Sequence, residues 1–184
     1  MSAIEKVILF GDSLMAGYGL PNEQHLSVVL QKNLEIDGHN IKIINGSVSG
    51  STSAGGLNIA EWTLSENNID LMILCLGAND MLRGINPKET KNNLEEIIQI
   101  AKNKNIKVII AGMTATTSYG FAYKKSFDKI FSDLAKKHKL QLIPFLLEGV
   151  AQNPKFNLSD GMHPNDQGTI IIGNTLKKAI LENL

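Results

Sequence analysis

The chain of 184 residues has one cysteine, few aromatic residues and no excess of charge of either sign. Because Cys75 has no second cysteine to pair with, an intrachain disulfide is excluded, and its apolar surroundings in Leu71–Leu76 predict a small buried side chain. Lys and Arg together number 18, as do Asp and Glu, so the formal net charge is zero. This balance gives no indication of a nucleic acid as partner.

Long apolar runs and metal-ligand spacings are also missing. No stretch approaches the roughly 20 apolar residues of a membrane helix, and no basic segment followed by an apolar one precedes the first strand. For the chain as given we therefore expect a cytoplasmic location, with a periplasmic one open if a signal segment has been removed. No cysteine or histidine spacing indicates zinc, so we expect neither a metal nor a cofactor.

What the sequence does contain is a regular alternation of apolar strand patterns and amphipathic helix patterns. This alternation predicts one α/β domain, residues 1–184, with a five-stranded parallel sheet between two layers of helices. The expected strands are Lys6–Phe10, Ile41–Ile44, Leu71–Leu76, Lys107–Ala111 and Gln141–Pro144. The expected helices are Glu23–Ile36, Ser53–Glu66, one that begins at Pro87 after an Asn86 cap, Tyr123–His138 and Pro164–Glu182.

The stretch Val7–Ser13 is the first chemical signal. A β-favouring apolar run stops at Gly11, and Asp12 and Ser13 follow at once. In parallel sheets ligands bind beyond the carboxyl ends of the strands, which makes Ser13 a candidate nucleophile.

A serine nucleophile needs a base, and His163 is the best candidate. It stands before a proline at the start of the last expected helix, three residues after Asp160, whose carboxylate could orient the imidazole. The alternative is a histidine that caps a helix, with an acid nearby by chance. His25, His39 and His138 are weaker candidates because they lie in or at the ends of helices or turns.

An oxyanion needs donors, and three are candidates. They are the backbone N–H groups of Ser13 and Gly50 and the side-chain amide of Asn79, all expected after strand ends. Gly50 could equally be a plain turn glycine, and Asn79 could cap its own loop.

Two competing motifs fail. The pair Gly17 and Gly19 lacks the third glycine of a dinucleotide fingerprint, since Asn22 stands there. The Gly-x-Ser-x-Gly nucleophile elbow is also absent, because Met15 occupies its last position.

Four blocks together resemble the SGNH/GDSL hydrolases. They are Gly11-Asp12-Ser13, Gly50, Gly77-x-Asn79-Asp80 and Asp160-x-x-His163-Pro164, and the similarity is greatest to the bacterial arylesterase and thioesterase I/protease I/lysophospholipase L1 branch. The resemblance implies a flavodoxin-like SGNH hydrolase fold, with Ser13 as nucleophile, His163 as base, Asp160 as its orienter, and Ser13, Gly50 and Asn79 as the oxyanion hole. It implies structural roles for Asp12 and Asp80. The branch usually has an acid where this chain has Ser51, which leaves the effect on the loop and on substrate preference open.

These inferences predict a metal-independent serine esterase that acts on small-molecule carboxylic esters. Short- to medium-chain and aryl esters are expected, with acyl thioesters and lysophospholipids as further candidates. The alternatives are a carbohydrate O-acetylesterase, which the 5% of aromatic residues disfavours, and a binding protein without catalysis. The oligomeric state and the physiological ester are not determined by the sequence.

Several apolar residues of the expected site loops could wall a substrate groove. The alternative for each is packing of the loop onto the core. The candidates are Leu14, Met81, Leu82, Met113, Tyr119, Phe121 and Met162, together with Met15 and Phe156.

Overall fold

The computed structural model describes residues 4–65 and 68–184. Its strands are β1 (Lys6–Gly11), β2 (Lys42–Asn45), β3 (Leu71–Cys75), β4 (Lys107–Ala111) and β5 (Gln141–Ile143). Its helices are α1 (Ser13–Ala16), α2 (Leu26–Ile36), α3 (Ser53–Thr63), α4 (Ala78–Leu82), α5 (Pro87–Asn103), α6 (Gly120–His138) and α7 (Asp166–Leu181), with a 3-10 turn, η1 (Asn22–Gln24).

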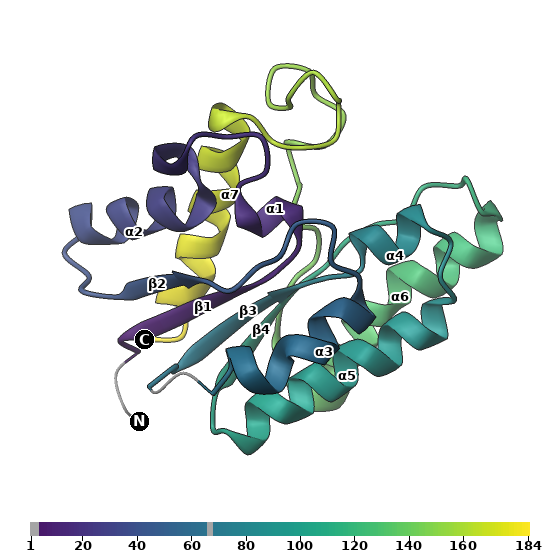
Figure 1. Ribbon diagram of the computed structural model, residues 1–184, viewed down its shortest axis with the longest axis horizontal. Coiled ribbons are helices and arrows are strands. Elements are labelled where there is room, and N and C mark those ends of the chain that lie inside the picture. The colour runs from purple at the N-terminus through teal and green to yellow at the C-terminus, as the bar shows by residue number, and fades with distance from the viewer. Residues whose placement is uncertain (1–3, 66–67) are drawn as a thin grey trace.

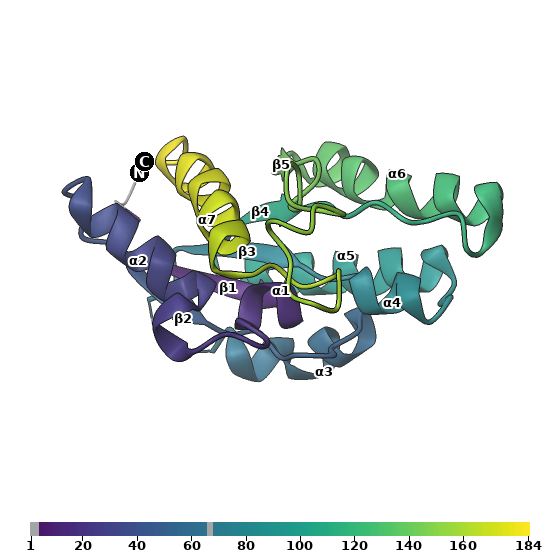
Figure 2. The ribbon, with the colours of Figure 1, turned by 90° about the horizontal axis from the view of Figure 1, so that it is seen from above.

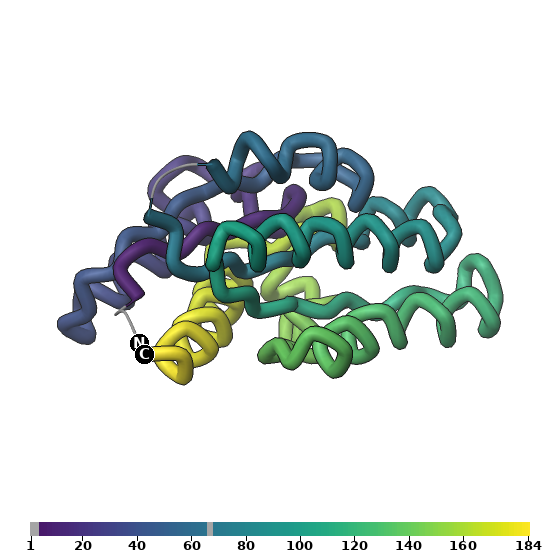
Figure 3. The backbone as a smooth tube through the Cα atoms, turned by 90° about the horizontal axis from the view of Figure 1, so that it is seen from below, coloured from purple at the N-terminus to yellow at the C-terminus, as the bar shows by residue number. Residues whose placement is uncertain are grey.

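The strands form one parallel sheet in the order β2-β1-β3-β4-β5. Figures 1 and 2 show α2 and α7 against one face of the sheet. Figure 3, seen from the opposite side, shows α3, α5 and α6 side by side across the other face. This arrangement confirms the predicted three-layer α/β/α architecture with a five-stranded parallel sheet.

The central strand explains the apolar run that predicted it. All five residues of β3 are fully buried, because neighbouring strands flank it on both sides and helices cover both of its faces. Cys75, its last residue, is a free, fully buried thiol, as predicted. Within the described ranges, no helix is long and apolar enough to cross a membrane.

The first long helix begins later than predicted. The expected helix from Glu23 is divided into η1 and α2, because His25 between them has an extended backbone. The cause is tertiary. The His25 ring packs against Gly17, where a Cβ would lie 2.4 Å from a ring carbon, and its Nε2 lies 3.1 Å from the Leu20 carbonyl oxygen.

The last helix also begins later than predicted. It starts at Asp166, because Pro164 pairs with Asn157 in an isolated antiparallel bridge and the Asn165 side chain caps the helix. Two other helices also differ from the prediction: α6 begins at Gly120 instead of Tyr123, and α3 ends at Thr63, while the predicted end at Glu66 lies outside the described residues.

Two short helices were not predicted. Each follows directly after a strand of the central pair, α1 after β1 and α4 after β3. They carry Ser13 and Asn79, so the segments expected to be loops are single helical turns that hold candidate site residues.

Candidate active site

Ser13 is the first residue of α1, immediately beyond the end of β1. Asp12 caps this turn: its Oδ1 accepts a hydrogen bond from Leu14 N at 3.1 Å. A Cβ on Gly11 would lie 2.6 Å from the Cys75 carbonyl oxygen, so only glycine allows the chain to leave β1 this close to β3. The Ser13 side chain is thereby presented at the carboxyl edge of the sheet.

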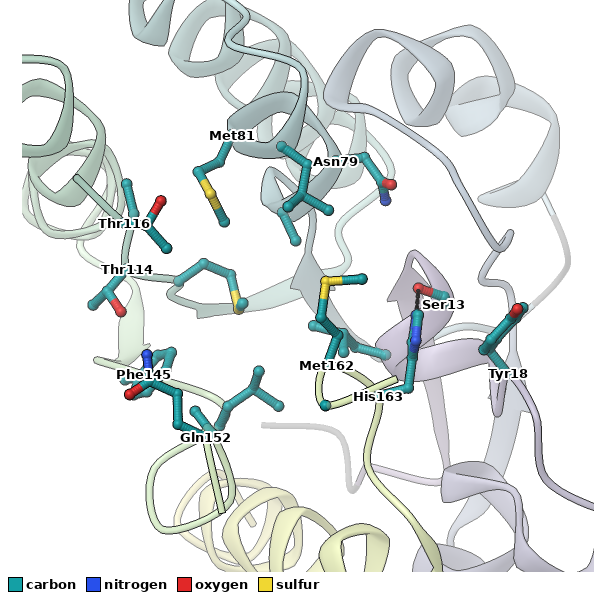
Figure 4. Close-up of a pocket in the computed structure, with 18 of the residues that line it drawn as sticks. Ser13, Tyr18, Asn79, Met81, Thr114, Thr116, Phe145, Gln152, Met162 and His163 are labelled. Atoms are coloured by element: carbon teal, nitrogen blue, oxygen red, sulfur yellow. Dashed lines mark hydrogen bonds between the residues drawn. The ribbon is translucent and has the colours of Figure 1, made fainter. Parts of the chain in front are cut away.

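His163 and Asp160 meet Ser13 from the other end of the sequence. Ser13 Oγ lies 2.9 Å from His163 Nε2 (Figure 4), and His163 Nδ1 lies 2.6 Å from Asp160 Oδ2. The other carboxylate oxygen of Asp160 accepts the backbone N–H groups of His163 and Met162 at 3.0 and 2.9 Å. These bonds, led by the one from the His163 N–H, lower the pKa of Asp160 to about 2.

The charge on Asp160 sets the tautomer of the imidazole. An ionised carboxylate can only accept hydrogen bonds, so Nδ1 of His163 carries the proton and Nε2 is left to accept one from Ser13. The segment that carries His163 is itself held, because Leu158 N donates to the His163 carbonyl oxygen at 2.7 Å. The sequence-predicted nucleophile, base and orienter are therefore brought into one hydrogen-bonded chain.

Two of the predicted oxyanion donors are open to a ligand. Among the described residues, neither Ser13 N–H nor Gly50 N–H has a hydrogen-bond acceptor, and both residues line the same pocket. Gly50 has φ of +79° and is the third residue of a turn closed by Ser51 N and the Val48 carbonyl oxygen at 3.1 Å. A positive φ at this position is typical of a type II turn, which fixes the direction of the Gly50 N–H.

Asn79 lines the same pocket, but its amide already has acceptors. Nδ2 donates to the Ser51 carbonyl oxygen at 3.1 Å and to Asp12 Oδ2 at 3.3 Å. Asn79 can therefore donate to an oxyanion only if one of these two hydrogen bonds is broken. The bond to Asp12 is the longer and weaker one, so it is the one we expect to be replaced.

The two acids placed next to site residues are buried. Asp12 is 1% exposed, and burial raises its pKa to about 6. Asp80 is fully buried and accepts hydrogen bonds from Ser53 N, Ser53 Oγ and Thr90 Oγ1. Asp80 thus joins α4, which carries Asn79, to the starts of α3 and α5. Helix α3 directly follows the turn that contains Gly50.

A pocket of about 870 Å³ opens beside Ser13 and His163 (Figure 4). Five of the predicted wall residues line it: Leu14, Met81, Leu82, Met113 and Met162.

Four other predicted wall residues do not line this pocket. The Tyr119 ring packs over Gly84 and its hydroxyl donates to the Leu82 carbonyl oxygen, while Phe121 is 81% exposed on α6. Met15 is fully buried in the core, and Phe156 lies beside the Lys155 ammonium. The prediction was wrong for these residues, because position in a loop does not determine which side of the loop faces the site.

Several lining residues were not predicted. They are Tyr18, Ser49, Ala78, Thr114–Thr117, Lys124, Phe145, Leu147, Ala151, Gln152 and Gly161. Tyr18 is the most notable, because its ring lies against His163, whereas in the sequence Tyr18-Gly19 counted only towards the resemblance to the esterase branch and gave Tyr18 no role in the site. In residues 4–65 and 68–184, no group of three or more His, Cys, Asp or Glu side chains is placed to hold a metal ion.

Comparisons with known proteins agree with this site. The model of the GDSL-like lipase/acylhydrolase family matches residues 9–169. An arylesterase of Vibrio mimicus is 35% identical over 182 residues, covering 99% of this chain and 91% of the relative. The thioesterase 1/protease 1/lysophospholipase L1 of Escherichia coli K12 is 30% identical over 179 residues, covering 97% and 85%.

A solved structure gives the same result for the fold. The crystal structure of TesA superposes with a TM-score of 0.91 at 32% identity, covering 98% of this chain and 100% of that one. The sequence-based resemblance is thus confirmed: the chain belongs to the GDSL-like lipase/acylhydrolase family and is a carboxylic ester hydrolase.

Proposed function

We propose that the protein is a serine esterase in which Ser13, His163 and Asp160 form a catalytic triad. The observation that carries the proposal is the pair of contacts at 2.9 and 2.6 Å that links Ser13 Oγ through the imidazole to Asp160. An alcohol in this position is activated when the imidazole takes its proton, and the carboxylate stabilises the imidazolium that forms.

The reaction then runs through an acyl-enzyme. As His163 Nε2 takes the Ser13 proton, Oγ bonds to the carbonyl carbon of the ester and the carbonyl oxygen becomes an oxyanion. The N–H groups of Ser13 and Gly50 stabilise this oxyanion, with the Asn79 amide once it leaves Asp12. His163 protonates the leaving oxygen or sulfur, the acyl group stays on Ser13, and water activated by the same imidazole releases the acid.

The walls of the pocket support carboxylic esters with apolar acyl or aryl groups as substrates. Leu14, Met81, Met113 and Met162 are apolar and lie beside Ser13 in the same pocket. Thioether side chains in particular adapt to slender apolar groups. Short- to medium-chain esters, aryl esters among them, are therefore the proposed substrates.

Labelling and a substrate panel test this function. A fluorophosphonate probe should modify wild-type protein at Ser13, while Ser13→Ala should be unlabelled and inactive and Ser132→Ala, on the exposed surface of α6, should behave as wild type. p-Nitrophenyl esters from acetate to dodecanoate should be hydrolysed faster than acetylated xylan is deacetylated. Labelling that persists in Ser13→Ala would refute the proposed nucleophile, and deacetylation of xylan alone would favour a carbohydrate esterase.

A further inference from the structure

The far wall of the pocket is a segment without regular structure. Residues 113–117 lie between β4 and α6 and all line the pocket. In Figure 4, Thr114 and Thr116 are at the side of the pocket opposite Ser13. A short acyl group on Ser13 therefore stays near Met162, whereas a longer one extends towards this wall.

One ion pair on α6 holds the middle of this wall by its backbone. Asp128 Oδ1 accepts the Ala115 N–H at 2.7 Å, and Lys124 Nζ donates to the Ala115 carbonyl oxygen at 2.7 Å. Lys124 Nζ also pairs with Asp128 Oδ2 at 2.7 Å. Both polar groups of the Ala115 backbone are thus bound by two side chains that are bound to each other.

The rest of the wall is held by few hydrogen bonds, beside the buried side chains of Met113 and Ala115. At its start, Gly112 N donates to the carbonyl oxygen of Ile143, the last residue of β5, and Leu146 N donates to the Gly112 carbonyl oxygen. At its end, Gly120 N donates to Thr117 O, which is a bond within the turn. Between them, in the described part of the chain, the Ala115 backbone is the attachment to α6.

Helix stability does not account for this ion pair. Lys124 precedes Asp128 by four residues, which is the less favourable order for a charge pair on a helix. Lys124 also lies near the N-terminal end of α6, where the helix dipole disfavours a cation. The ion pair therefore stabilises the wall segment more than it stabilises the helix.

We propose that Lys124 and Asp128 determine acyl-chain selectivity by fixing the position of the Ala115 wall. The inference rests on the proposed esterase function and assigns to its pocket a specificity element remote from Ser13. The pair acts on acyl groups long enough to contact residues 113–117, because a preorganised wall binds a chain without the cost of ordering it first. Acyl groups too short to reach the wall are unaffected.

Two variants and a matched control test this inference. Asp128→Asn keeps an acceptor for Ala115 N–H but removes the ion pair, and Lys124→Met keeps the apolar stem but removes the donor to the Ala115 carbonyl. Asp133→Asn is the control, because Asp133 on the same helix pairs with Lys91 at 2.8 Å and is not in the pocket. The measurement is kcat/KM for p-nitrophenyl butanoate and octanoate, with the fluorophosphonate labelling rate of Ser13.

We expect the octanoate-to-butanoate ratio of kcat/KM to fall about fivefold in both variants, the equivalent of slightly more than one buried methylene. In Asp128→Asn, which changes no residue of the pocket lining, the labelling rate and the butanoate value should stay at the wild-type level, and Asp133→Asn should match wild type throughout. An unchanged ratio in both variants would overturn the inference while leaving the esterase intact. Failure of wild-type protein to be labelled at Ser13 would instead overturn the proposed function.

Discussion

The ring of Tyr18 lies against the imidazole of His163, with 4.4 Å between ring centroids and 37° between ring planes. Figure 4 shows Tyr18 on the side of His163 away from Met162. The tyrosine stands between Gly17 and Gly19, which both have positive φ, and a Cβ on Gly19 would lie 2.7 Å from the Leu158 side chain. The turn that carries Tyr18 is therefore packed closely against the segment that carries His163.

This contact predicts that the Tyr18 ring, and not its hydroxyl, keeps the imidazole aligned with Ser13. Tyr18→Ala should lower kcat about fivefold on p-nitrophenyl butanoate with little change in KM, since such ring pairs contribute about 1 kcal/mol. Tyr18→Phe should retain wild-type kcat, because the ring remains. A rise in KM without loss of kcat would mean that Tyr18 contacts substrate instead, and equal losses in both variants would assign the effect to the hydroxyl.

A second prediction concerns the direction of the Gly50 N–H. Gly50 has φ of +79°, and a Cβ added there would meet nothing within 4 Å. Gly50→Ala therefore causes no steric clash, but an alanine is strained at this positive φ. The strain favours a turn in which the Ser49–Gly50 peptide is reversed, so that the N–H of residue 50 points away from the pocket. We expect kcat/KM to fall about tenfold, and Gly50→Asn to lose less because asparagine tolerates positive φ.

Gly38 provides the control for this substitution. It has φ of +83°, also with nothing within 4 Å of an added Cβ, and it follows α2, away from the pocket. Gly38→Ala should therefore lower the melting temperature as much as Gly50→Ala does but leave kcat/KM unchanged. If both substitutions lowered activity equally, the loss at Gly50 would reflect stability and not the oxyanion donor.

The layers of the fold and the contact between Ser13 and His163 could be predicted from the sequence. The carboxyl ends of parallel strands share one edge, so residues placed after strands come together whatever their separation in the chain. Asp160 and His163 are three residues apart, so a single turn of backbone brings them into contact. Their pairing could therefore also be predicted from the local sequence.

Other parts of the site depend on contacts that no local pattern encodes. Helices α1 and α4 have four and five residues, too short to show a helical period. Tyr119 and Phe121 were expected in the pocket, but the Tyr119 hydroxyl donates to the Leu82 carbonyl oxygen and Phe121 lies exposed on the first turn of α6. Tyr18 was missed for the same reason, because its contact with His163 exists only after the two chain ends have folded together.

The last prediction concerns the buried carboxyl group of Asp12. Burial raises its pKa to about 6, an effect that Asp80 increases and that hydrogen bonds from Leu14 N and Asn79 and the charge of His163 reduce. Because the unfolded chain has an ordinary pKa near 3.8, the folded protein holds this proton more strongly. The free energy of unfolding should therefore fall by about 2 kcal/mol as pH rises from about 4 to 7, and level off above the folded pKa.

Asp12→Asn isolates this contribution. An asparagine is neutral at every pH and its Oδ1 still accepts the Leu14 N–H, so the pH dependence that Asp12 causes should vanish. The amide of the new residue faces the Asn79 amide, but this costs the same free energy at each pH and leaves the slope unchanged. Urea unfolding between pH 4 and 7 measures the difference between wild type and variant.

The contribution of Asp160 does not interfere in this range. Its pKa is lowered, so the stability it supplies is present above the unfolded pKa near 3.8 and is lost only as pH falls further, towards 2. Asp133, whose pKa is also lowered, behaves in the same way, so Asp133→Asn should shift the unfolding curve equally at pH 4.5 and pH 7.

Parallel pH curves for wild type and Asp12→Asn would contradict the prediction. They would show that Asp12 is ionised in the folded protein across this range, and that its hydrogen bonds outweigh the effect of its burial on its pKa.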